Sequence, residues 1–232
     1  LFPQARVLRM DADTTREKAG HEKILSAFSD GEADILIGTQ MIVKGHDFPN
    51  VTLMGVLAAD LSLNVSDFRA SENTFDLLVQ AAGRAGRGER CGNVVIQTYQ
   101  TDHYAIESSA KQSYEEFYDS EVMFRRVGAY PPFGHLLKIL IECKNENRIE
   151  HFANGLAEYI RGAIDGDEFF EKTKVLGPED DYPKKLNDVY RKTLYLKDRN
   201  YDRLIKAKRL ISENWNQLDG ANFVNIWFDY DP

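Results

Sequence analysis

The sequence predicts an α/β protein in two parts, a domain with a mostly parallel sheet followed by a small α+β sandwich. Three observations lead to this fold class. Apolar strand-like segments alternate with amphipathic segments through the first half, as in parallel sheets joined by right-handed crossovers. Glycine and prolines then interrupt the chain near residues 127–132. The segments beyond this break follow the order strand, helix, strand, strand, helix, strand.

The first half is expected to contain short apolar strands that end at polar or glycine-containing segments. Residues 51–59 run without polar alternation, as a strand covered on both faces would. Residues 74–82 have helical spacing, with Phe75, Leu78 and Ala82 on the buried face. The strands are expected at residues 5–10, 34–39, 51–59 and 93–98, and the helices at residues 21–29, at 74–82 and, in two pieces, at 104–126.

The second half predicts a ferredoxin-like sandwich, because its βαββαβ order is that of a split βαβ fold. Its first helix, residues 149–164, places Phe152, Leu156 and Ile160 on one face. The first domain is therefore expected to cover residues 1–129 and the second residues 130–232. Within the second domain the strands are expected at residues 136–141, 174–176, 190–197 and 222–228, and the second helix at residues 201–213.

The composition is that of a soluble globular protein with an uneven charge. The formal net charge of −8 argues against a surface dominated by nucleic-acid binding. Residues 184–209, however, hold ten basic and three acidic residues. No apolar run approaches the length of a membrane span. A basic region on an otherwise acidic chain is therefore the main charge feature.

Cys91 and Cys143 lie far apart and form no C-x-x-C pair, so we expect free thiols in a reducing compartment. The histidines are scattered, and the sequence shows no zinc site. The chain begins without methionine, just before an expected strand, and its start is not a signal peptide. We therefore interpret it as a fragment of a longer protein and expect the fragment to be monomeric.

Two arginines stand three residues apart, each directly after a glycine, in the segment Gln-Ala-Ala-Gly-Arg-Ala-Gly-Arg-Gly at residues 80–88. If the preceding helix continues to Arg87, then Gln80, Arg84 and Arg87 share one polar face. The glycines would cost helix stability, which favours close approach of another surface. A planar guanidinium binds two phosphate oxygens at once and suits a transferring phosphoryl group. The alternative is a set of surface ion pairs at a helix end.

A second candidate segment is Gly-Thr-Gln-Met-Ile-Val-Lys-Gly-His-Asp-Phe-Pro-Asn-Val at residues 38–51. It follows an expected strand, and ligands of parallel sheets bind beyond the carboxyl ends of strands. The alternative is an ordinary loop. Asp60 and Glu72 form a further candidate. They could be an acid–base pair, but we prefer a structural role, in which they order the loop carrying Asp67 and Arg69 or pair with one of the arginines.

These segments resemble a known family. The pattern Gln-x-x-Gly-Arg-x-Gly-Arg is similar to the sixth motif of superfamily 2 helicases, and residues 38–51 resemble the fifth motif in the form typical of the PriA family of bacterial replication-restart helicases (primosomal protein N-prime). Asp-Phe-Arg-Ala-Ser-Glu at residues 67–72 and Tyr-Pro-Pro-Phe at residues 130–133 continue the PriA pattern. The resemblance covers nearly the whole chain. The sixth motif alone is moderately specific, and the combination is specific to PriA.

The resemblance implies a second RecA-like helicase lobe followed by a C-terminal domain similar to ribosomal protein S10. It implies that Arg87 is the arginine finger at the γ-phosphate, that Arg84 assists it, and that Gln80 contacts the nucleotide or the attacking water. It also implies that Gly45 and Asp47 face the nucleotide cleft. Thr39 would contact a DNA phosphate without reading sequence.

The basic region interleaves tyrosines, Tyr182, Tyr190, Tyr195 and Tyr201, with its cations. Lysines and arginines bind phosphates, and aromatic rings can stack on exposed bases. The alternative is a solvated helix face with structural tyrosines, and the family resemblance favours DNA contact more than the pattern does. The residues that we predict to contact DNA here are Lys184, Lys185, Arg191 and Lys192.

Several parts of a complete motor are missing from the sequence. It has no G-x-x-x-x-G-K-[ST] phosphate loop, no helicase second motif, and no cysteine array like the zinc region of PriA. We therefore expect no ATP hydrolysis by this fragment alone. ATP and Mg²⁺ would act in the full-length protein, and Zn²⁺ would bind a region absent here.

For that full-length protein the resemblance implies 3′-to-5′ movement on DNA in the bacterial cytoplasm, at the nucleoid. The implied partners are forked and single-stranded DNA, single-stranded DNA-binding protein and primosome components, with no membrane. The rival hypothesis is a non-catalytic module that docks DNA or single-stranded DNA-binding protein. A non-replicative helicase of the same superfamily is a third hypothesis, which residues 130–133 disfavour.

Overall fold

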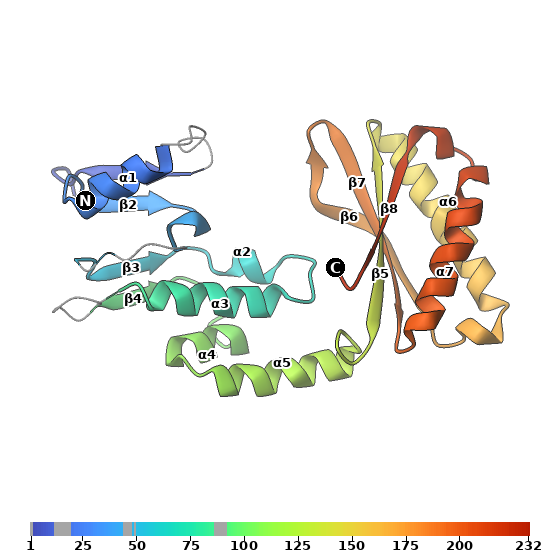
Figure 1. Ribbon diagram of the computed structural model, residues 1–232, viewed down its shortest axis with the longest axis horizontal. Helices are drawn as coiled ribbons and strands as arrows, with labels where there is room; N and C mark the ends of the chain where they lie inside the picture. The colour runs from blue at the N-terminus through green and yellow to red at the C-terminus, as the bar shows by residue number, and fades with distance from the viewer. Residues whose placement is uncertain (1, 12–19, 44–47, 49, 86–91) are drawn as a thin grey trace. The chain divides into compact units, whose positions relative to one another are not determined.

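The computed structural model describes residues 2–11, 20–43, 48, 50–85 and 92–232 (Figure 1). The chain forms two compact units. The first unit comprises residues 1–64 and 69–118, and the second comprises residues 65–68 and 119–232. The division therefore lies inside helix α5, Tyr114–Gly128, and not at the expected boundary between residues 129 and 130.

The first unit contains parallel strands, as predicted. β1 (Val7–Met10) pairs with β2 (Ile35–Gly38), and β3 (Leu53–Val56) pairs with β4 (Asn93–Ile96). Among the described residues these are two separate pairs and not one continuous sheet. The parallel pairing is confirmed, and each pair brings together strands that are distant in sequence.

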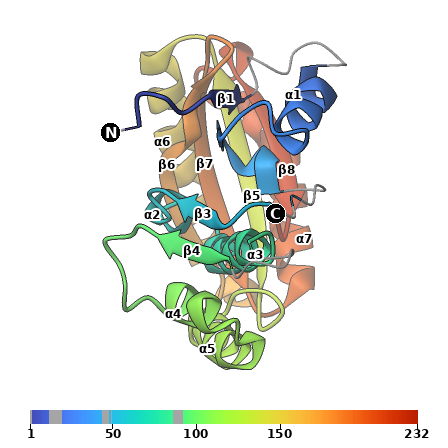
Figure 2. The ribbon, with the colours of Figure 1, turned by 90° about the vertical axis from the view of Figure 1, so that its left-hand side faces the viewer.

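Helices pack against each strand pair of the first unit. α1 buries Leu25 against Met10 of β1, and α3 lies beside α4 (Figure 1, Figure 2). Phe75 of α3 stacks on Phe117 with ring centroids 4.2 Å apart. The predicted two-piece helix is confirmed, because Gln112 has a φ of 53° between α4 and α5. The elements are α1 (Gly20–Ser29), the 3₁₀ helix η1 (Gln40–Val43), α2 (Asp60–Leu63), α3 (Ala70–Ala82) and α4 (Tyr104–Lys111).

The prediction that residues 51–59 are covered on both faces is wrong for the described chain. Leu53 is 63% exposed, whereas Met54 and Val56 are partly buried. Val7, Ile37 and Val95 are likewise more than half exposed. The burial alternates along the strand, because the described helices cover only one side of each pair. An uninterrupted apolar run shows that both faces of a strand are apolar, but it does not show which face the rest of this chain buries.

The second unit has the predicted βαββαβ order. Its sheet has the strand order β6-β7-β5-β8 with every neighbour antiparallel, which is the ferredoxin-like arrangement. β6 is longer than the expected residues 174–176, because it continues through irregular pairing to a tight turn at Asn187 and Asp188, which both have positive φ. The elements are β5 (His135–Cys143), α6 (Glu146–Asp165), β6 (Lys174–Leu186), β7 (Val189–Asp198), α7 (Tyr201–Asn214) and β8 (Asn225–Tyr230).

The core of the second unit lies between this sheet and the two helices on one of its faces (Figure 1). α6 buries Phe152, Leu156 and Ile160, as predicted, and α7 buries Leu204 and Ile211. Their N-termini are capped by Asn145 and Asn200, whose side chains accept backbone N–H groups. Within the described residues, no helix is both long enough and apolar enough to span a bilayer.

Candidate functional site

Helix α3 ends before the first arginine of the predicted phosphate-binding pair. The Gly83 N–H donates to the Val79 carbonyl at 2.9 Å, and the Arg84 N–H donates to the Ala81 carbonyl at 3.0 Å. Arg84 therefore lies in a turn after the helix. A shared polar face was expected only if the helix continued to Arg87, and this condition is not met at Arg84. The i,i+3 bond of Arg84 tightens the chain where Gly83 weakens the helix. Arg87 lies outside the described residues.

Gln80 and Arg84, the described polar residues of the motif, differ in their surroundings. Gln80 is exposed, and Arg84 is half-buried and has an interaction partner within the chain. Gly83 has a φ of −68°, and an added Cβ would meet the Val79 carbonyl oxygen at an ordinary 3.5 Å. No close approach of the described chain therefore requires this glycine. Phosphate binding by Arg84 stays a prediction, with local ion pairing as the alternative.

The buried face of α3 is formed by Phe75, Leu78 and Ala81, whereas the predicted Ala82 is only partly buried. Thr74 also lies inside, with its Oγ1 2.7 Å from the Ala70 carbonyl oxygen. The same Oγ1 lies 2.9 Å from the hydroxyl of Ser62 in α2. These contacts hold the helix that leads to Gln80 and Arg84.

The second candidate segment begins where a glycine is sterically required. A Cβ on Gly38 would overlap the carbonyl oxygen of Met10 and lie 2.6 Å from the side chain of Ile42. Thr39 follows β2 directly and is exposed, and its carbonyl accepts the Ile42 N–H at 3.1 Å. The exposed hydroxyl lies at the carboxyl end of a parallel strand, as predicted. Its role toward DNA stays a prediction.

The segment is anchored at both ends of the part that the structure describes. Ile42 packs against the core formed by Met10, Leu25 and Phe48. Phe48 meets Phe28 edge-on, with ring centroids 5.0 Å apart. The predicted nucleotide residues Gly45 and Asp47 fall outside the described residues.

The two candidate segments come together in the first unit. η1, which follows Thr39, contacts α3, which leads to Gln80 and Arg84. Segments some forty residues apart in sequence therefore border one region. The sequence predicted both segments, and the fold places them next to each other.

The carboxylate of Asp60 has a structural role. It accepts a hydrogen bond from Thr98 Oγ1 at 2.7 Å and from the Tyr99 N–H at 3.1 Å. The Thr98 hydrogen bond, followed by that of Tyr99, lowers the pKa of Asp60. The preferred structural interpretation is thus supported. Asp60 fixes the segment after β4, however, and not the loop carrying Asp67 as we expected.

Lys184 and Lys185 of the predicted DNA-contacting set are exposed but paired. Lys184 Nζ lies 2.9 Å from Glu146 and 3.1 Å from Asp180. Lys185 Nζ lies 2.9 Å from the highly exposed Asp188. Exposed ion pairs of this kind contribute little stability, so another anion can replace the carboxylate beside each lysine. Their accessibility is compatible with phosphate contact.

Arg191 and Lys192 are held inside ion-pair networks. Arg191 Nη2 lies 2.8 Å from Asp181. Lys192 is 8% exposed, and its Nζ lies 2.7 Å from Glu150 and 3.1 Å from Asp180. Removing such a cation from its carboxylates leaves them uncompensated, so these two residues are poorly placed for DNA contact. Sequence alone could not show this, because the partners come from β6 and α6.

The tyrosines of the basic region divide in the same way. Tyr182 is 76% exposed and Tyr201 is 40% exposed, so both could stack on a ligand. Tyr190 and Tyr195 are partly buried, and burial raises the pKa of Tyr195 to about 12. The last two serve the sheet, as the alternative interpretation expected for part of this set.

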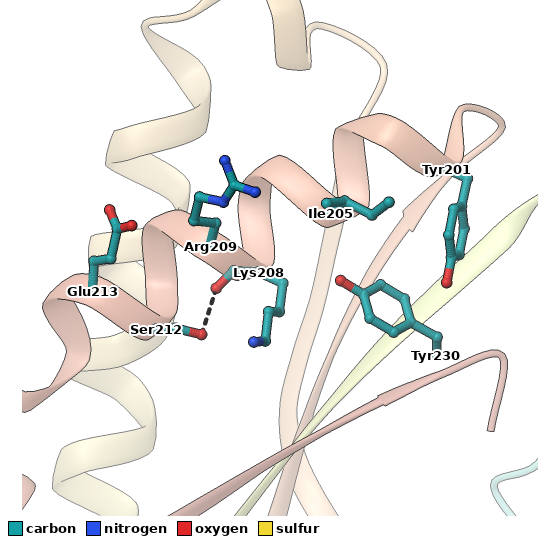
Figure 3. Close-up of a pocket in the computed structure, with 7 residues that line it drawn as sticks. All are labelled: Tyr201, Ile205, Lys208, Arg209, Ser212, Glu213 and Tyr230. Atoms are coloured by element: carbon teal, nitrogen blue, oxygen red, sulfur yellow. Dashed lines mark hydrogen bonds between the residues drawn. The ribbon is translucent and has the colours of Figure 1, made fainter.

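A surface pocket of about 430 Å³ lies between α7 and β8 and was not predicted from the sequence (Figure 3). In the part of the chain that the structure describes, neither Lys208 nor Arg209 pairs with a carboxylate there. The rings of Tyr201 and Tyr230 lie 5.2 Å apart at its other end. Both cations belong to the basic region at residues 184–209 that the sequence showed. Tyr230 lies outside that region, and only the fold places it beside them. The pocket is lined by Tyr201, Ile205, Lys208, Arg209, Ser212, Glu213 and Tyr230.

Comparison with known proteins now adds to this geometry. Residues 2–89 match the model of the helicase conserved C-terminal domain, and residues 126–232 match that of the primosomal protein N C-terminal domain. The chain is 42% identical over 232 residues to the replication restart protein PriA of Bacillus subtilis. The chain belongs to the PriA family. The helicase match contains both PriA motif segments, so the family resemblance of the sequence is confirmed.

Other PriA proteins show the same relationship. The PriA of Synechocystis is 39% identical over 207 residues, which cover 88% of this chain and 24% of that protein. The PriA of Chlamydia trachomatis is 34% identical over 231 residues, which cover the whole chain and 30% of that protein. The Bacillus subtilis alignment likewise covers the whole chain and 28% of that PriA. The chain therefore spans about a quarter to a third of these relatives.

Proposed function

We propose that this chain supplies the second motor lobe and the C-terminal domain of an ATP-driven 3′-to-5′ DNA helicase. The complete protein would recognise and remodel stalled replication forks and begin primosome assembly in the bacterial cytoplasm. The observation that carries the proposal is the contact between η1 and α3, within a match to the helicase C-terminal domain. The PriA relatives support the replication-restart role.

ATP would supply the phosphoryl-transfer chemistry that drives movement. In our proposal Arg87 is the arginine finger, Arg84 assists it, and Gln80 contacts the nucleotide or the attacking water. Gly45 and Asp47 would line the same cleft. Gln80 is exposed, and Arg84 lies in the turn that follows α3. Both positions are compatible with a ligand at this end of the helix.

The proposed metal ions are Mg²⁺ and Zn²⁺, and neither is assigned to the described residues. Among these, no group of three His, Cys, Asp or Glu side chains is placed to hold a metal ion. We propose that Mg²⁺ accompanies ATP, held by parts of the full-length protein that this chain does not contain. Zn²⁺ would bind the cysteine region of the family, which also lies outside this sequence.

The test of the motor proposal is DNA-stimulated ATP hydrolysis. We expect this chain alone to hydrolyse no ATP and the full-length protein to hydrolyse it in the presence of forked DNA. Arg87→Ala should then lower the turnover rate by about 10³-fold or more, as expected for an arginine finger. Hydrolysis by the isolated chain that Arg87→Ala abolishes would contradict the proposed division of the ATP site.

A second candidate function is docking of a protein partner, and the α7–β8 pocket is the observation that favours it. Its two cations pair with no carboxylate among the described residues, and with the apolar and tyrosine lining they suit an acidic peptide that also carries an apolar side chain. We propose single-stranded DNA-binding protein or a primosome component as that partner.

Reversing one pocket charge separates docking from motor activity. Arg209→Glu should weaken binding of single-stranded DNA-binding protein by about tenfold, or ~1.4 kcal/mol, and leave DNA-stimulated ATP hydrolysis unchanged. Lys172→Glu, which changes an exposed lysine outside the pocket lining, is the matched control. Equal partner affinity in the wild-type and Arg209→Glu proteins would remove the pocket from the proposal.

A further inference from the structure

The four residues between Asn64 and Arg69 belong to the second unit, although the chain on both sides belongs to the first. The chain therefore leaves the first unit after α2, enters the second, and returns at the residue directly before α3. α3 is the helix whose far end leads to Gln80 and Arg84. Its start is thus covalently tied to a segment that the second unit holds.

Phe68 is the residue that anchors this segment. Its ring stacks on that of Tyr130, with centroids 5.7 Å apart and an interplanar angle of 8°. The Arg125 guanidinium carbon lies 5.1 Å from the Phe68 ring centroid. Arg125 is itself fixed, because its Nε donates to Glu121 at 2.6 Å and its Nη1 donates to the Pro131 carbonyl at 3.3 Å.

Tyr130 is equally constrained. The Phe124 ring stacks on it at 5.6 Å, and Lys197 Nζ lies 3.3 Å from its centroid. A Cβ on Gly128 would lie 2.6 Å from the Tyr130 ring, so a glycine is required there. Lys197 belongs to β7 of the sandwich. Phe68 therefore packs on a group connected to the core sheet, which we call the Phe68 cluster: Phe68, Phe124, Arg125, Tyr130 and Lys197.

The motor proposal does not use this cluster, although Phe68 and Tyr130 fall in the two segments that continue the PriA pattern. Resting on the proposed function, we infer that Phe68 is a positioning residue for ATP hydrolysis. By holding the segment before α3 in the second unit, it sets the position of the α3 start. DNA binding by the second unit then alters the far end of the same helix. In this proposal a shift of the α3 start is carried along the helix to its far end. The stacking of Phe75 on Phe117 keeps α3 packed during that shift.

A role in packing alone predicts a different result. Loss of packing would lower stability and reduce all activities together. Loss of positioning would lower the DNA-stimulated turnover rate while leaving ATP affinity, DNA affinity and the DNA-independent rate unchanged. The two roles are therefore separable by kinetics.

The experiment uses the full-length protein that contains this chain, with the variants Phe68→Ala and Phe68→Tyr. Phe223→Ala is the matched control. Phe223 also lies under an arginine, with Arg148 3.8 Å from its ring, but it lines a pocket of the second unit whose lining includes no member of the Phe68 cluster. kcat and KM for ATP are measured with and without saturating forked DNA, and DNA affinity is measured by titration.

We expect Phe68→Ala to lower the DNA-stimulated kcat by about tenfold, with KM for ATP and DNA affinity within twofold of wild type. Phe68→Tyr should restore stimulation, and Phe223→Ala should behave as wild type. Wild-type stimulation in Phe68→Ala, or an equal loss in Phe223→Ala, would overturn the proposal. A parallel loss of DNA affinity and basal rate would also overturn it. Phe68→Leu, which removes the ring but keeps apolar volume, takes the place of Phe68→Ala if the latter does not fold.

A second measurement remains decisive if the proposed function itself fails, that is, if the wild-type protein shows no DNA-stimulated hydrolysis. Amide hydrogen exchange then reports the start of α3 directly. Phe68→Ala should speed exchange at Asn73, whose N–H donates to the Arg69 carbonyl at 2.8 Å, whereas Phe223→Ala should not. Unchanged exchange at Asn73 in Phe68→Ala would refute the positioning role independently of activity.

Discussion

At the scale of single residues, the first unit depends on polar groups that are fixed by neighbours distant in sequence. Asp60 follows β3, yet its hydrogen-bond donors, Thr98 and Tyr99, follow β4. Because β3 and β4 are parallel partners, their carboxyl ends lie side by side, and one carboxylate can fix the chain beyond both. Asp76 on α3 is in the opposite situation. Although the residue is exposed, partial desolvation of its carboxyl group and the nearby Glu72 raise its pKa.

These opposite pKa shifts predict opposite effects of pH. The folded pKa of Asp60 lies below its unfolded value, so its stabilisation is present above about pH 4 and is lost as the pH falls through the folded pKa. Asp60→Asn should therefore lower the thermal midpoint at pH 7, and its difference from wild type should narrow toward pH 3. The raised pKa of Asp76 favours folding at low pH instead, so Asp76→Asn should not lower the midpoint at pH 7. Thermal unfolding at both pH values checks the pair, and a constant difference for Asp60→Asn would contradict the account.

At the scale of helices and strands, two lysines on neighbouring elements illustrate how the fold assigns different roles to similar residues. Lys185 lies near the exposed end of β6, beside the turn to β7. Lys192 lies within β7 and contacts Glu150 of α6. Both belong to one basic stretch of the sequence, and only the cross-strand and helix contacts distinguish a surface cation from an internal one.

This distinction predicts separate losses of DNA binding and of stability. Changing Lys184 and Lys185 together to Ala should weaken fork binding and reduce the salt dependence of the affinity by roughly two counterions, with little effect on stability. Lys192→Ala should lower the free energy of unfolding by roughly 1.5–3 kcal/mol, because a hydrogen-bonded buried charge is lost. Fork titrations at several salt concentrations and denaturant unfolding are the measurements. An unchanged salt slope in the double variant would exclude these lysines from the DNA interface.

The helices and strands could be predicted from apolar periodicity and from glycine and proline breaks. Some of their ends could not, because tertiary contacts set them. The apolar spacing of α6 and the proline break near residue 130 predicted the βαββαβ half, and capping by Asn145 and Asn200 agrees with it. The length of β6 was not predictable, because its distal part has polar composition and is a strand only through pairing with β7. The end of α3 at Ala82 agrees with the predicted helix at residues 74–82, whereas its start at Ala70 lies four residues before the predicted one.

At the scale of the whole molecule, the chain is two compact units joined by α5 and by the short passage through residues 65–68. The sequence motifs predicted the candidate nucleotide segments of the first unit, because their residue types reflect phosphate chemistry. The α7–β8 pocket and the Phe68 cluster were not predicted, because each assembles residues that are far apart in the chain. The chain spans about a quarter to a third of its PriA relatives. Its sequence holds no phosphate loop, and our proposal therefore assigns that part of the ATP site to residues outside it.

The most direct test of that account is steady-state ATP hydrolysis by the full-length protein with forked DNA, compared between wild type, Arg87→Ala and Arg87→Lys. We predict a loss of about 10³-fold or more in kcat for Arg87→Ala, incomplete rescue by Lys because an ammonium lacks the two-pronged geometry, and no hydrolysis by the isolated chain. DNA-stimulated hydrolysis at the wild-type rate in Arg87→Ala would contradict the claim that this segment completes the ATP site.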